Sequence, residues 1–90
     1  MVRTDQATIV NQEQANREQL AANVRRLRRE KDWTQNQLAE HSKVSRATIA
    51  CIELAHGDVS LSTLSRLAYA LGQPTAILLI PQPGAPTIGF

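Results

Sequence analysis

Two short stretches with helical spacing, joined by a tight polar turn, lie in the middle of this chain and constrain its fold more than any other feature. Thr34 precedes the first stretch and Gln37 lies three residues later, the pattern of a capping box in which each side chain hydrogen-bonds the other residue's backbone. Ser45 precedes the second stretch, where Ile49 and Ile52 lie three residues apart and share one face of a helix. The pattern predicts a helix-turn-helix motif.

The segment before this motif has the pattern of a longer helix. Between residues 11 and 31, Leu20, Val24 and Leu27 recur at helical spacing among good helix formers. The same segment contains a cluster of basic residues, namely Arg25, Arg26, Arg28, Arg29 and Lys31. These side chains either form a solvated helix face or, for one or two of them, lie near phosphates.

The segment after the motif has a second long helical pattern. Ser60 is placed to cap a helix that Gly72 ends. The apolar stripe of this helix consists of Leu61, Leu64, Leu67, Ala68 and Leu71. Residues 75–80 follow Pro74 and are nearly all apolar, which predicts a short fifth helix. We therefore expect an all-α fold, a compact five-helix bundle.

The length of 90 residues fits one domain. Residues 1–10 show no sustained period and predict a flexible N-terminal arm, and residues 11–80 form the helix-turn-helix domain. Residues 81–90 are rich in Pro and Gly and predict an extended tail. Its apolar residues Ile88 and Phe90 either wrap a second subunit as a dimer arm or belong to a disordered end.

Several classes of function are disfavoured by the composition. The net charge is only +2, and the single cysteine, Cys51, makes neither an internal disulfide nor a zinc site with the two histidines. No segment is long and apolar enough for a signal peptide or a membrane span. We expect a cytoplasmic protein without cofactor or metal, and not an enzyme, because the sequence has no nucleophile–base pair and no glycine-rich phosphate loop.

These residues resemble the DNA-binding domain of the Cro and phage-repressor family, also called the XRE-type helix-turn-helix regulators. The resemblance covers about residues 20–80 and implies a lambda-repressor-like fold. The family pattern is matched by Leu27-Arg28, Thr34-Gln35, Leu38-Ala39, Val44, Ile49, Ile52-Glu53, Ser60 to Leu64 and Leu67 to Gly72. Two positions depart from it, since Lys43 and Ala55 stand where the family has glycine. A left-handed Lys43 costs roughly 1 kcal/mol.

The resemblance makes the second motif helix a recognition helix whose exposed face meets DNA. Arg46 opens that face, and its forked guanidinium fits O6 and N7 of guanine in the major groove. The alternative for Arg46 is a phosphate contact. The predicted base-contacting residues are Arg46, Ala47 and Ala50. The predicted phosphate-contacting residues are Gln35, Asn36, Lys43, Ser45 and Thr48, with Ser45 serving equally as a plain helix cap.

The resemblance also implies one structural ion pair, between Arg28 of the first helix and Glu53 at the end of the recognition helix. Trp33 is expected to pack beneath the second helix, the alternative being base stacking. Cys51 is either a redox-sensitive thiol or a small tolerated residue. His41 and His56 are expected to be isolated surface residues.

The expected function is sequence-specific binding of double-stranded DNA, by a homodimeric repressor on a palindromic, inverted-repeat operator. The predicted dimer interface consists of Ile77, Leu78 and Ile80, because one short helix cannot bury so many apolar residues alone. Contact with RNA polymerase is a further possibility for the same family. The alternatives are a restriction-modification controller and the antitoxin of a toxin–antitoxin pair, in which the arm or tail neutralises a toxin protein.

Overall fold

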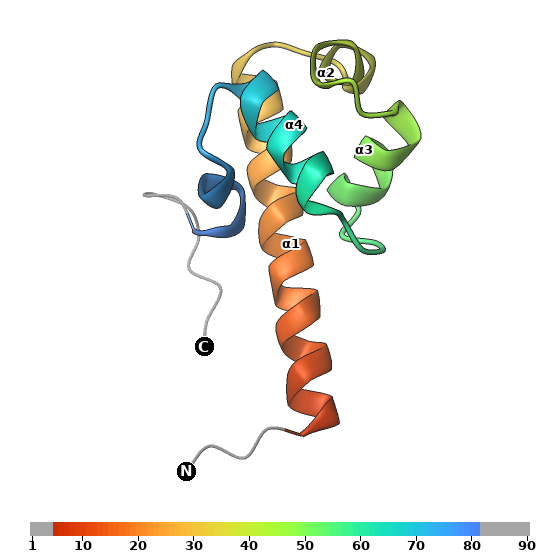
Figure 1. Cartoon of the computed structure of the whole chain (residues 1–90), viewed down its shortest axis with the longest axis vertical. Helices are drawn as coiled ribbons and strands as arrows, with labels where there is room; N and C mark the ends of the chain where they lie inside the picture. The colour runs from red at the N-terminus through yellow and green to blue at the C-terminus, as the bar shows by residue number, and fades with distance from the viewer. Residues whose placement is uncertain (1–4, 82–90) are drawn as a thin grey trace.

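Helix α1 (Gln6–Glu30) is the longest element, and most of the other elements pack along its C-terminal half (Figure 1). The structure is a computed structural model that describes residues 5–81. The remaining elements are α2 (Gln35–Ser42), α3 (Arg46–Glu53), α4 (Leu61–Leu71) and the 3-10 helix η1 (Thr75–Leu79). In Figure 1, α3 lies on one side of α1, η1 lies on the other, and α4 crosses α1 between them. The described residues contain helices and connecting turns without a strand, so the expected all-α class is confirmed for them.

Local hydrogen bonds explain where the helices begin. The backbone N–H of Gln37 donates to Oγ1 of Thr34 and the N–H of Thr34 donates to Oε1 of Gln37, so the predicted capping box is present. Ser45 and Ser60 cap α3 and α4 in the same manner, each accepting from the N–H three residues later. These contacts satisfy N–H groups that have no partner within the helix.

Left-handed residues explain where several helices end. Gly72 ends α4 at φ 70°, and Lys43 ends α2 at φ 61°, as expected for its place in the turn. Asp32 and Ala55 also have positive φ values, of 56° and 59°. Each non-glycine residue in this conformation costs about 1 kcal/mol, which the surrounding packing must offset.

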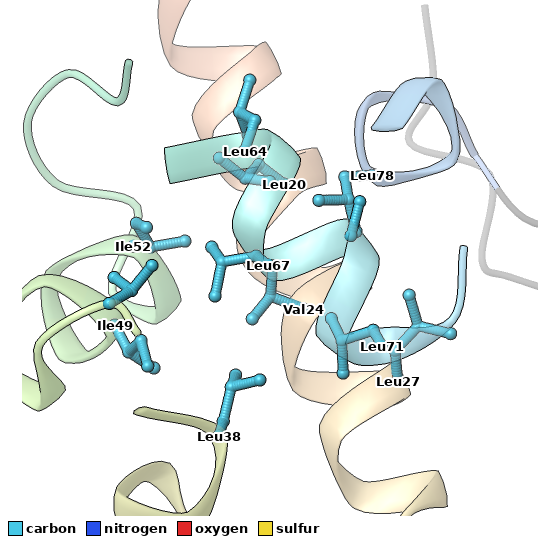
Figure 2. Packing of buried hydrophobic residues seen from close by; sticks show 12 residues of the cluster. Leu20, Val24, Leu27, Leu38, Ile49, Ile52, Leu64, Leu67, Leu71 and Leu78 are labelled. Atoms are coloured by element: carbon cyan, nitrogen blue, oxygen red, sulfur yellow. The ribbon is translucent and has the colours of Figure 1, made fainter. Parts of the chain in front are cut away.

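The core is aliphatic and draws on all five elements. Figure 2 shows Leu67 of α4 near the centre of the buried side chains, with Ile49 and Ile52 of α3 on one side and Leu78 of η1 on the other. The other members of this cluster are Leu20, Val24, Leu27, Leu38, Val44, Leu64, Ala68 and Leu71. Trp33 packs against it partly buried. Burial of each large side chain contributes roughly 1.5–3 kcal/mol, which makes this cluster the main source of stability.

The start of α1 differs from the prediction. The helix begins at Gln6, five residues before the expected start, so residues 6–10 are helical rather than part of a flexible arm. The reason is local, because Oδ1 of Asp5 accepts from the N–H of Thr8 at 2.8 Å and caps the helix. Adding turns to a helix that is already nucleated is also far easier than starting one. Residues 1–4 lie outside the described part of the chain.

The predicted fifth helix is a 3-10 helix of five residues, so the described fold has four α-helices and η1. Leu78 is 0% exposed and belongs to the core, which corrects its assignment to a dimer interface. Asn23 of α1 explains this burial. Its buried Nδ2 donates to the carbonyl oxygens of Ile77, Leu78 and Ile80 at 3.2, 2.9 and 2.9 Å, and so holds η1 against α1. The predicted tail falls outside the described residues, except for Pro81.

Candidate nucleic-acid interface

The outward face of α3 brings the three predicted base-contacting residues together. Arg46 and Ala47 are exposed and Ala50 is half-buried, whereas Ile49 and Ile52 on the opposite face are buried in the core. Positions three and four residues apart are neighbours on a helix surface, so Ala50 lies beside both Ala47 and Arg46 and joins the three side chains into one strip. The side chain of Arg46 has neither a hydrogen bond nor an ion pair with any residue from 5 to 81, which leaves its five N–H donors available.

The side-chain hydrogen bonds at the N-terminus of α3 are local. Oγ of Ser45 accepts from the N–H of Thr48 at 3.2 Å and donates to Oγ1 of Thr48 at 2.8 Å. Ser45 is therefore a helix cap in this structure, and both side chains remain exposed. The single O–H of Ser45 is engaged in this contact, whereas the O–H of Thr48 can donate to a phosphate oxygen. Both phosphate contacts remain predictions.

The turn between α2 and α3 exposes Lys43 next to this helix end. Its neighbour Ser42 is buried, and Oγ of Ser42 accepts from the N–H of Val44 at 3.2 Å. Val44 is buried as well, so the turn is fixed on both sides of Lys43. The left-handed backbone at Lys43 points to a conformation imposed by the motif rather than by the lysine itself.

Gln35 and Asn36 lie at the N-terminus of α2, where backbone N–H groups favour anions. Asn36 is exposed. Gln35 is half-buried, and its Nε2 donates to Oε1 of Glu53 at 3.3 Å. The side chain of Gln35 is thus tied to the end of α3, an interaction that the sequence pattern did not predict.

The opposite end of α3 is anchored by the ion pair that was expected. Nε and Nη2 of Arg28 donate to the two carboxylate oxygens of Glu53, each at 2.8 Å. The two side chains are only 13% and 4% exposed. Hydrogen bonds from Arg28 to the Glu53 carboxylate raise the pKa of Arg28 above its ordinary value, so this guanidinium stays charged at neutral pH. Nη1 of Arg28 also donates to the carbonyl of Trp33 at 2.8 Å.

The basic cluster of α1 divides between internal and external roles. Arg28 pairs with Glu53, and Nη1 of Arg25 donates to the carbonyl oxygen of Glu53 at the C-terminus of α3. A cation at this position interacts favourably with the helix dipole. Arg26 pairs with Glu30 at 3.1 Å on the surface, and Arg29 and Lys31 are exposed. The alternative of phosphate contact therefore remains open mainly for Arg29 and Lys31.

Trp33 has the expected place against the core and one unexpected neighbour. Its ring stacks on the ring of His41 with centroids 4.2 Å apart and planes within 7°. Nζ of Lys31 lies 5.2 Å from the Trp33 ring centroid. His41 is a surface residue, as predicted, but it is not isolated, because it covers the outer side of Trp33.

Two residues with structural consequences for the site had no assigned role in the sequence. Asn23 is a buried polar residue on the apolar face of α1, and this break in the pattern is the signal that marks it. Arg17 reaches the loop between α3 and α4, about 40 residues away along the chain, with its Nε 2.9 Å from the carbonyl oxygen of Gly57. No local pattern marks Arg17, because its partners are set by the tertiary fold.

Within residues 5–81, no helix combines the length and apolar character that a bilayer requires.

The sequence and the fold of this chain are similar to those of known helix-turn-helix proteins. A family model described as a helix-turn-helix domain matches residues 19–77. A protein named as a hypothetical transcription factor, from Neisseria meningitidis serogroup B (strain ATCC BAA-335 / MC58), is 35% identical over 69 residues. Those residues are 77% of this chain and 65% of the Neisseria protein, so this chain spans less than two thirds of that relative's length. The crystal structure of hypothetical transcription factor NHTF from Neisseria has a TM-score of 0.72 and 35% identity, covering 77% of this chain and 78% of the other.

Proposed function

Because this chain belongs to the XRE-type helix-turn-helix family, we propose that it is a sequence-specific regulator of transcription that binds double-stranded DNA, and that it acts as a homodimeric repressor. The single observation that carries the proposal is the outward strip of α3. A guanidinium without internal partners stands at the N-terminus of a helix whose opposite face and far end are fixed to the core. The name of the Neisseria relative, a transcription factor, supports the same function.

In this mechanism α3 enters the major groove with its N-terminus first. Arg46 donates both arms of its fork to O6 and N7 of one guanine, and small Ala47 lets the helix approach closely enough to touch a thymine methyl group. Ala50 continues the contact one turn further along. These contacts supply the sequence information, because each base pair presents a distinct set of groups in the major groove.

Contacts to the phosphate backbone fix the register of α3. The candidate residues are Gln35, Asn36, Lys43, Ser45 and Thr48. The N-terminal N–H groups of α2 add favourable interactions with a phosphate. Gln35 connects these phosphate-contacting residues to the C-terminal end of α3, because its side-chain amide donates to Glu53. Such contacts supply most of the affinity and weaken steeply as salt rises.

A homodimer would set two α3 helices about 34 Å apart, one helical turn of DNA, so the operator should be an inverted repeat with half-site centres about 10–11 base pairs apart. The surface proposed for the dimer is the exposed end of η1. Ile80 and Leu79 are 47% and 42% exposed, and Ile77 is half-buried beside them. Leu78 has no part in it because it lies inside the protomer.

Sedimentation equilibrium tests this interface. Ile80→Asp should yield monomers at micromolar concentration with the helical circular dichroism intact, because the charge falls on a surface side chain. Leu61→Asp on α4 changes another exposed aliphatic residue; it is the matched control and should leave the dimer unchanged. A stable dimer of the Ile80→Asp variant would move the interface elsewhere.

Selection of bound duplexes from a random DNA pool tests the function itself, at roughly physiological salt. Enrichment of an inverted repeat with the stated spacing supports dimeric groove readout and supplies the operator. Enrichment of a single half-site would retain sequence-specific binding and reject the symmetric dimer. A folded protein that enriches no motif would contradict the proposal and favour an interaction module such as an antitoxin.

A further inference from the structure

The N-terminal half of α1 reaches the loop between α3 and α4 through the side chain of Arg17. Nε of Arg17 donates to the carbonyl oxygen of Gly57 at 2.9 Å, and Nη2 donates to Oδ1 of Asp58 at 2.8 Å. The amide of Gln14 lies 3.5 Å from the carbonyl oxygen of Ala55 in the same loop. One guanidinium fork therefore holds both a backbone carbonyl and a carboxylate of residues that directly follow the recognition helix.

The loop has a conformation that needs such support. Ala55 and Gly57 both have left-handed backbones, with φ values of 59° and 72°. The loop's own hydrogen bonds lie at its start, where the N–H groups of Ala55 and His56 donate to carbonyls of α3. Further along, the hydrogen bonds from Arg17 connect the loop to α1.

Charge gives the contact a second consequence. In Figure 1 the loop lies on the same side of α1 as α3 and away from η1. The Asp58 side chain is 94% exposed, whereas that of Arg17 is only 26% exposed. An exposed carboxylate beside a surface that binds a polyanion opposes binding unless a cation compensates it.

We propose that Arg17 is a positioning residue for DNA binding, which compensates the charge of Asp58 and holds the loop after the recognition helix away from the phosphate backbone. This inference rests on the proposed DNA-binding function. A solvent-exposed ion pair contributes little to folding, so the contact matters more to a bound anion than to stability. Glu13, whose carboxylate lies 3.7 Å from Nη2 of Arg17, is a second and weaker partner.

A double-mutant cycle tests the inference on the DNA selected by the wild-type protein. Arg17→Ala should weaken binding about fivefold at physiological salt, because Asp58 then repels phosphate uncompensated. In the Asp58→Asn background the same substitution should weaken binding by less than about twofold. Arg26→Ala is the matched control, since it removes the same charge from a surface pair elsewhere on α1, and its effect should be equal in both backgrounds.

Equal losses for Arg17→Ala in the two backgrounds would overturn the inference and make Arg17 either a direct phosphate ligand or a source of general charge. Amide hydrogen exchange of residues 55–59 in the free protein supplies a second readout and should be faster in Arg17→Ala than in Arg26→Ala. Unchanged exchange would overturn the loop-holding role. If the wild-type protein shows no sequence-specific DNA binding, the proposed function is rejected as well. If it binds specifically but the effects of Arg17→Ala and Asp58→Asn are independent of each other, only this inference is rejected.

Discussion

The two ends of α3 are built in opposite ways. At its C-terminus, Glu53 is buried and receives two hydrogen bonds from Arg28, while Arg25 donates to its carbonyl oxygen. At its N-terminus, the side chain of Arg46 has no hydrogen-bond or ion-pair partner among residues 5–81, and Ser45 provides only a local cap. The C-terminal end of α3 therefore fixes the direction of the helix, whereas the N-terminal end leaves an arginine free for the proposed contact with DNA.

This division explains why the basic residues of α1 and α3 differ in role although both are arginines. Arg28 lies where its fork meets a buried carboxylate, so Nε and Nη2 are engaged by Glu53 and Nη1 by the carbonyl oxygen of Trp33. Arg46 lies on an exposed face, so its donors are saturated only by water or by a bound molecule. If the donors of Arg46 were also engaged within the protein, α3 would be stable but would have no free guanidinium to donate to a base.

The largest expected effect comes from breaking the anchored end. Glu53→Ala leaves the guanidinium of Arg28 nearly buried without its partner, which should lower the free energy of unfolding by about 3–5 kcal/mol. A domain of this size has only about 5–13 kcal/mol in total. Urea denaturation measures the loss. Glu40→Ala on the exposed face of α2 is the control and should change stability by less than about 0.5 kcal/mol. A loss below about 1 kcal/mol for Glu53→Ala would contradict the anchoring role.

The next effect concerns the free end. Arg46→Ala should weaken binding to the selected DNA by about 1–3 kcal/mol and relax specificity at one base position, with stability unchanged. Competition binding against duplexes substituted at each position measures this. Arg66→Ala removes an equal charge from the exposed face of α4 and should not alter specificity at any position. An equal loss on every sequence for Arg46→Ala would make Arg46 a phosphate ligand instead.

A smaller effect is expected from the cap that holds the free end in shape. Ser45→Ala removes the acceptor for the N–H of Thr48 and should lower the free energy of unfolding by about 1 kcal/mol. Ser45→Gly should lower the free energy of unfolding by only a few tenths of a kcal/mol relative to the wild type, since glycine is tolerated at an N-cap position. If denaturation midpoints of the Ala variant and the wild type coincide, the hydroxyl does not cap α3.

The smallest effect concerns a helix end that has no tertiary anchor at all. The backbone N–H of Thr8 lowers the pKa of Asp5, so the charged cap stabilises the first turn of α1 at neutral pH. Because the folded pKa is the lower one, this contribution is lost as pH falls through it. The protection of the Thr8 amide, meaning its exchange rate relative to the intrinsic rate of an unstructured amide at the same pH, should therefore decrease under acid conditions. Asp5→Asn keeps a capping oxygen without a titrating group and should remove this pH dependence; its persistence would point to another group.

The local parts of this structure were predictable from the sequence. The capping box of Thr34 and Gln37, the stripe of Ile49 and Ile52 and the stop at Gly72 depend on residues within a few positions of one another, and each is present. Arg28 and Glu53 are 25 residues apart, and only the family resemblance linked them. Local chemistry thus determines helices and caps, and tertiary pairs need further information.

The errors fall where distant segments meet. The apolar composition of residues 75–80 predicts a dimer surface that includes Leu78, whereas the carboxamide of Asn23 holds this segment against the core and Leu78 is buried. The start of α1 depended on Asp5, a single cap that a search for sustained apolar periodicity does not detect. Gln35 and Arg17 have partners set by the packing of α1, α2 and α3, which no local pattern specifies.

The most direct test of the division between the two ends of α3 is a nuclear magnetic resonance titration of the isotope-labelled protein with the selected duplex. Amide shifts should change most at residues 34–36 and 45–50, whereas those of Ile52 and Glu53 should change little. Large changes confined to η1, to the outer face of α4 or to the anchored end of α3 would show that DNA binds elsewhere and would contradict the account.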